Sequence, residues 1–113
     1  MTGRERVSRW APVLLWAGVI FAFSSIPSLT TGLGLWDLAL RKCAHAAEYA
    51  LLGALLLRAT GRARLAVALG SAYAVTDEIH QHFVHGRVGS PLDWAIDTAG
   101  VAVGVLLYAR LAR

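Results

Sequence analysis

Two stretches of the sequence place a histidine and a carboxylate one helical turn apart. His45 and Glu48 form the first pair, and Asp77 and His80 form the second. Residues three apart lie on the same face of an α-helix, so each pair can present both groups to one point. An imidazole with an ordinary pKa of about 6.5 exchanges protons near neutral pH, and a carboxylate can orient it. The pairs predict acid–base chemistry, with the catalytic candidates His45, Glu48, Asp77, Glu78 and His80.

Basic and polar residues next to these pairs could hold an anionic group. Arg41 and Lys42 precede His45 by about one helical turn, and Arg87 follows the second pair. Arginine contacts a phosphate or carboxylate with two hydrogen bonds, and lysine supplies a point charge. The candidate substrate-binding residues are Arg41, Lys42, Gln81, Arg87, Ser90, Asp93 and Asp97.

The same pairs also fit a metal site. Carboxylates and histidines three residues apart on facing helices supply the ligands of some helix-bundle metal centres. Mixed oxygen and nitrogen donors suit zinc, manganese or iron. A divalent metal held by His45, Glu48, Asp77 and His80 is therefore an alternative to metal-free chemistry. The single cysteine, Cys43, excludes an internal disulfide and a site with several cysteine ligands.

The elements that must position these residues are apolar and long. Hydrophobic residues make up 57% of the 113 residues and charged residues 16%, whereas soluble domains carry roughly 25% charged residues. So small a chain cannot bury this much apolar surface within itself. The apolar segments cover about residues 10–26, 38–57, 65–83 and 92–111, close to the ~20 residues that cross a bilayer as a helix. We expect an all-α fold, a transmembrane four-helix bundle forming a single domain over residues 1–113.

Arginine and lysine indicate how this bundle is oriented. Basic residues cluster before the first segment, between the second and third, and after the fourth, at Arg4, Arg6, Arg9, Arg58, Arg62, Arg64, Arg110 and Arg113. The other two loops contain only Arg87. The positive-inside rule therefore places both termini in the cytoplasm of a multi-pass protein of the cell membrane. A cleaved signal peptide over residues 1–26 is the alternative interpretation of the first segment.

In this orientation the polar residues gather near the extracytoplasmic surface. The second segment enters there with residues 41–48, the third leaves there with residues 77–82, and the fourth enters with Asp93 and Asp97. An ionisable group at the bilayer centre costs roughly 2.5–3.5 kcal/mol on insertion scales, so these groups must pair, bind a cation or reach water. Gly100 and Gly104 share the face of Asp97 and allow close helix packing. We expect one shared polar site.

The residues of this site also carry a family resemblance. The stretch RKCAHAAEYALLG at 41–53 resembles the first signature of the VanZ-like family, and DEIHQHFVHGRVGSPLD at 77–93 resembles the second. The resemblance continues through Asp97 to Gly100, and it implies a small multi-helix membrane protein related to proteins linked to resistance to the glycopeptide teicoplanin. This sequence has His85 where the family often has Pro, and Asp97 where Asn is frequent.

Three classes of function follow as hypotheses. The first is a protein that binds or acts on an anionic lipid-linked cell-envelope substrate at the outer leaflet, with membrane lipid around it; the residues leave open whether turnover occurs. The second is a metal-dependent membrane hydrolase. The third is a non-catalytic protein that alters envelope composition or docks a partner. Transport would require a homo-oligomer that encloses a path. Nucleic acid is excluded as a partner, because the basic residues form no stripe interleaved with exposed aromatics.

Overall fold

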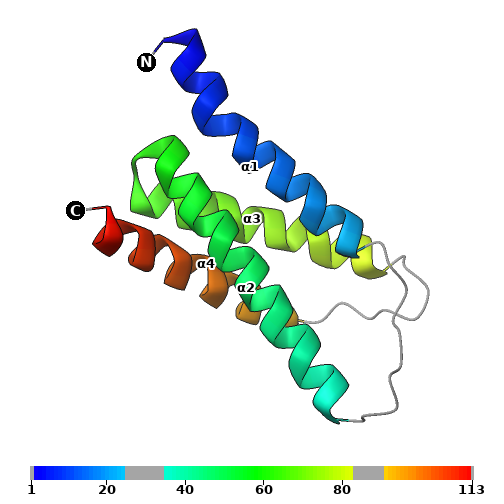
Figure 1. Cartoon of the computed structure of the whole chain (residues 1–113). Coiled ribbons are helices and arrows are strands. Elements are labelled where there is room, and N and C mark those ends of the chain that lie inside the picture. The colour runs from blue at the N-terminus through cyan, green and yellow to red at the C-terminus, as the bar shows by residue number, and fades with distance from the viewer. Residues whose placement is uncertain (1, 25–34, 83–90, 113) are drawn as a thin grey trace.

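The architecture is known from a computed structural model that describes residues 2–24, 35–82 and 91–112, with side chains for 2–23, 42–80 and 94–112. Within these ranges the chain is all-helical and has no strand (Figure 1). The helices are α1 (Gly3–Ser24), α2 (Leu35–Thr60), α3 (Ala63–His82) and α4 (Pro91–Leu111). The four predicted helices are confirmed.

Helix α1 begins several residues before its predicted start because the sequence caps it there. Thr2 and Glu5 have the spacing of a capping box. The Thr2 hydroxyl oxygen accepts a hydrogen bond of 3.1 Å from the Glu5 backbone N–H, which satisfies one of the unpaired donors of the first turn. Hydropathy marks only the apolar part of a helix, so it missed this polar first turn.

A proline inside α1 is accommodated by an arginine from α2. Pro12 has no backbone N–H, so the carbonyl of Ser8 one turn earlier loses its helical hydrogen bond. The Arg58 guanidinium donates a hydrogen bond of 3.0 Å to that carbonyl oxygen. The contact ties the first half of α1 to the end of α2, so Arg58 has a structural role in addition to its charge.

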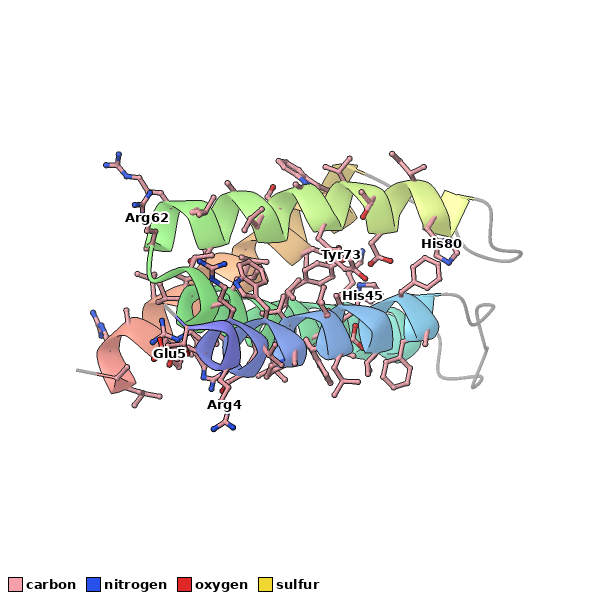
Figure 2. The ribbon with its side chains drawn as sticks, turned by 90° about the horizontal axis from the view of Figure 1, so that it is seen from above. Arg4, Glu5, His45, Arg62, Tyr73 and His80 are labelled. Carbon is pink, nitrogen blue, oxygen red and sulfur yellow. The ribbon has the colours of Figure 1, made fainter. Side chains whose placement is uncertain are left out.

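A tight turn reverses the chain between α2 and α3. Gly61 adopts a φ of 70°, in the left-handed region that favours glycine, and its N–H donates to the Leu57 carbonyl over 2.8 Å. Such a short connection makes α2 and α3 antiparallel neighbours. The N-terminus, this turn and the C-terminus therefore lie at one end of the bundle, with the labelled Arg4 and Arg62 there and His80 at the other end (Figures 1 and 2).

Helices α2 and α4 form the most extensive interface. Glycines let their backbones touch: a Cβ atom added at Gly100 would overlap the carbonyl of Ala46, and one at Gly104 would overlap the carbonyl of Ala50. Gly53 of α2 meets the backbone of α4 in the same way. The predicted close packing through Gly100 and Gly104 is confirmed.

Two of the helices have the length and apolarity to cross a membrane by themselves, over Gly3–Phe23 of α1 and Trp94–Leu111 of α4 within the described chain. Helices α2 and α3 contain 26 and 20 residues, which at 1.5 Å per residue span about 39 and 30 Å. They are long enough for a hydrocarbon core of about 30 Å, but they carry the charged residues of the predicted site.

Replacing Gly104 with alanine should destabilise the bundle, because the new methyl group must push α4 away from the backbone of α2. We expect Gly104→Ala to lower the free energy of unfolding by about 1–3 kcal/mol, the usual cost of overpacking. Gly18→Ala is the matched control, because nothing lies within 4 Å of a Cβ atom there; a gain of up to ~1 kcal/mol in helix propensity is expected. Unfolding in detergent micelles measures both, and equal stabilities would contradict this packing.

Candidate functional site

The candidate site is built around a histidine and a buried aspartate on facing helices. His45 of α2 and Asp97 of α4 form an ion pair when the imidazole is protonated, with 3.4 Å between Nδ1 and Oδ1. Asp97 is only 2% exposed, and the His45 side chain is 19% exposed. Gly100, one helical turn after Asp97, contacts Ala46, the residue after His45. This close contact between the two backbones brings the His45 and Asp97 side chains within reach of each other. A larger distance between α2 and α4 would break the contact between the imidazole and the carboxylate.

A tyrosine connects this pair to α3. The Tyr49 hydroxyl donates a hydrogen bond of 2.8 Å to Oδ2 of Asp77, and both residues are buried. Tyr49 follows His45 by one turn of α2, and their rings are stacked with centroids 6.4 Å apart. Tyr73 of α3 lies against Tyr49, with ring centroids 6.2 Å apart. The Tyr49 side chain therefore fixes where the Asp77 carboxylate points.

Further polar contacts hold α3 against α4 near the same level. The hydroxyl groups of Ser71 and Thr98 are 3.2 Å apart, and either can donate the hydrogen bond. The Trp94 indole N–H donates to the Ser71 carbonyl over 3.2 Å. Thr98 directly follows Asp97, so these bonds help to set the position of Asp97 relative to α3.

Three predicted site residues meet at one point. Metal-ligating atoms of His45, Asp77 and Asp97 all lie within 4.8 Å of one another. We call these three residues the His–Asp–Asp cluster. Each comes from a different helix, α2, α3 or α4, and Figure 2 shows His45 between the ribbons in the interior of the bundle.

The other described candidates lie on α2 and α3. His80 stacks on Phe21 of α1, with ring centroids 4.2 Å apart. Glu48 is half-buried, and its backbone carbonyl accepts a hydrogen bond of 2.9 Å from the Trp16 indole. Lys42 and Glu78 are also half-buried. Among the described residues, the group of ligating atoms includes neither Glu48 nor His80, and the four-residue metal set stays a prediction.

Five of the predicted site residues have side chains outside the described part of the structure. Arg87 and Ser90 lie outside the described residues. Arg41, Gln81 and Asp93 belong to α2, α3 and α4, but their side chains are outside the described part. Arg41 lies in the second turn of α2, Gln81 in the last turn of α3 and Asp93 in the first turn of α4.

Tyr49 belongs to the site but was not among the residues predicted from the sequence. Tyr49 shares the helical stripe of Lys42 and His45, but its residue type alone did not mark it as part of the site. Its hydrogen bond to Asp77 places it there. The signal that could have found it is the recurrence of polar side chains one turn apart on α2.

The arrangement can hold and move a proton. A carboxylate beside Nδ1 favours a proton on that nitrogen and stabilises the imidazolium, which leaves Nε2 to exchange a proton with a bound molecule. Asp97 is placed to orient the His45 ring in this way. Asp77 adds a second carboxylate at the same place, so the cluster attracts cations as well as protons.

Comparison with known proteins identifies a family. The sequence profile of the VanZ/LLP1 family matches residues 9–112 of the chain. No curated protein and no solved structure matches it. The match includes all three residues of the His–Asp–Asp cluster, and it confirms the resemblance seen in the sequence.

Removing the Tyr49 hydroxyl should destabilise the protein, because a buried carboxylate loses a hydrogen-bond donor. We expect Tyr49→Phe to lower the free energy of unfolding by about 1–3 kcal/mol. Tyr108→Phe is the control, a half-buried tyrosine at the far end of α4, with an expected change within about 0.5 kcal/mol.

A double-mutant cycle tests whether Asp77 is the partner. Tyr49→Phe and Asp77→Ala should be coupled by at least about 0.5 kcal/mol, because each removes the same hydrogen bond. Additive effects of the two substitutions on unfolding would show that the hydroxyl and the carboxylate act separately.

Proposed function

Because the chain belongs to the VanZ/LLP1 family, we propose that it is a multi-pass membrane protein that binds an anionic lipid-linked substrate of the cell envelope at the outer leaflet. One observation carries the proposal: three helices converge on a cluster of one partly exposed imidazole and two buried carboxylates. Ionisable groups inside membrane helices are rare and usually belong to functional sites.

The surface of the bundle supports a membrane location. Large apolar side chains are exposed on all four helices: Leu14, Leu15, Phe21 and Phe23 on α1, Leu51 on α2, Leu65, Leu69, Val75 and Ile79 on α3, and Val103, Leu106 and Leu107 on α4. An apolar surface this extensive on a small protein favours contact with lipid or another protein. We infer that each helix turns this face to lipid and its polar residues inward.

The distribution of charge supports the sidedness. The labelled Arg4 and Arg62 lie at the end that holds both termini, and His80 lies at the opposite end (Figure 2). With the basic end in the cytoplasm, the end that holds His80 faces outward. The His–Asp–Asp cluster belongs to the helix halves that approach this outer end, where an envelope lipid can reach it.

The proposed roles follow from chemical type. Lys42, with Arg41 and Arg87, would attract the phosphate of the substrate, because a cation in a low-dielectric site binds an anion strongly. His45 would exchange a proton with the substrate while Asp97 holds its ring. Glu48, Glu78 and His80 would position the bound group. A protein that changes such a substrate, or its exposure, would alter the response to glycopeptides such as teicoplanin.

Thiol labelling tests the sidedness. On a Cys43→Ser background, a membrane-impermeant reagent should label Ser28→Cys in intact cells, because residue 28 belongs to the loop without Lys or Arg. Arg62→Cys should be labelled only after the membrane is permeabilised. The Cys43→Ser chain without an added cysteine is the control for background. The reverse pattern would place the site in the cytoplasm and remove the envelope substrate.

A second experiment tests the substrate and the chemistry. Purified full-length protein should bind polyprenyl phosphates or lipid-linked wall precursors saturably, and Lys42→Gln should weaken binding about tenfold or more. If turnover occurs, His45→Gln should slow it about a hundredfold or more, the usual contribution of a general acid or base. Glu5→Gln, an exposed acidic residue at the opposite end, is the control.

The outcomes separate the hypotheses. Binding without turnover, unchanged by His45→Gln, would favour a non-catalytic docking protein over an enzyme. Absence of saturable binding to any of these lipids would refute the proposed substrate class.

A further inference from the structure

We propose that the His–Asp–Asp cluster binds one divalent transition-metal ion, zinc or manganese, between α2, α3 and α4. The ligands would be His45, Asp77 and Asp97, one from each helix. This set differs from the one predicted from spacing, because Asp97 takes part and Glu48 and His80 do not.

The distances suit an ion. Two ligands of a tetrahedral ion bound at about 2.0–2.2 Å lie about 3.4 Å from each other. The Nδ1 atom of His45 and Oδ1 of Asp97 are 3.4 Å apart. Ligating atoms of all three residues lie within 4.8 Å of one another, so a small rotation of a carboxylate completes the approach. An ion between these atoms would replace the direct contact of His45 with Asp97, so the proton exchange proposed for His45 applies to the metal-free protein.

The surroundings of the cluster resemble the outer shell of a metal site. Carboxylate ligands are commonly held by a hydrogen bond from a second residue, which fixes their orientation. Tyr49 donates such a bond to Oδ2 of Asp77, and a carboxylate has a second oxygen that can bind the ion. The glycine contacts between α2 and α4 fix the spacing of the other two ligands. A hydrogen bond therefore orients Asp77, and helix packing sets the distance between His45 and Asp97.

Charge and burial point in the same direction. Asp77 and Asp97 are each only 2% exposed. A divalent cation would balance the charge of both carboxylates and leave the imidazole neutral, the form that binds metals. One nitrogen and several oxygen donors without cysteine suit zinc or manganese.

Three protein ligands leave a coordination position open. Catalytic zinc sites likewise have three protein ligands, with water or substrate as the fourth. A phosphate oxygen of the lipid-linked substrate would fit that position, and this step rests on the proposed function. Binding of the ion itself does not depend on it.

Direct measurement of ion binding tests the site. Full-length protein is purified in detergent, stripped of metal with a chelator, and titrated with zinc and manganese salts by calorimetry. We expect saturation at one ion per chain. Asp77→Asn and Asp97→Asn should each weaken binding at least about tenfold, because the loss of even an outer-shell partner has an effect of this size. Glu5→Gln, at the opposite end of the bundle, should leave it unchanged.

Two further arms keep the test decisive if a variant does not fold. The wild-type protein should show a raised unfolding temperature with zinc or manganese, because an ion that binds only the folded state stabilises it. Cobalt added to the wild-type protein should give the visible absorption of a four- or five-coordinate site. Absence of saturable binding to the wild-type chain would overturn the proposal and leave a structural ion pair.

The variants also distinguish this set from the alternative. Glu48→Gln should weaken ion binding less than Asp97→Asn does. Strong loss in Glu48→Gln with none in Asp97→Asn would assign the ion to the set predicted from spacing and overturn this proposal. Metal binding without lipid binding would refute the proposed function alone. Lipid binding without metal binding would refute only this inference.

Discussion

The structure depends on the contact between the backbones of α2 and α4. Gly100 and Gly104 have no side chains to hold the two helices apart, so the backbones of Ala46 and Ala50 contact α4 directly. Only at this separation can a side chain as short as aspartate reach an imidazole on the facing helix. The His45–Asp97 pair is therefore a consequence of helix packing as much as of its own chemistry. A stripe of small residues here positions polar groups as well as joining two helices.

The remaining helices complete the enclosure of this pair. Helix α3 supplies Asp77, which Tyr49 holds in place. Helix α1 packs on α2 and α3, and hydrogen bonds to backbone carbonyls join it to both: the Trp16 indole donates to Glu48, and the Tyr73 hydroxyl donates to Ala17. Aromatic donors suit this role, because they bury a large apolar ring and satisfy a polar atom at its edge.

The sequence predicted much of this arrangement, and its omissions have physical causes. Four helices and the meeting of polar groups at one level followed from apolar segment length and from the placement of arginines. His45 and Asp77 were recognised as site residues because each has a partner one turn away along its own helix. That criterion favoured Glu48 and His80 as their metal-binding companions, but in the described chain His80 stacks on Phe21 and the third member of the cluster is Asp97.

The sequence by itself determined which helices form, where their polar faces lie and that glycines line α4. These properties depend on residues close together in the chain, through helical periodicity and capping. Only the tertiary structure decided that Asp97 faces His45 and that Tyr49 holds Asp77. Those pairings link residues on different helices, and they depend on helix rotation and separation, which are set by packing among the helices. Periodicity gives the face of a helix; the choice of partner across the interface requires the assembled bundle.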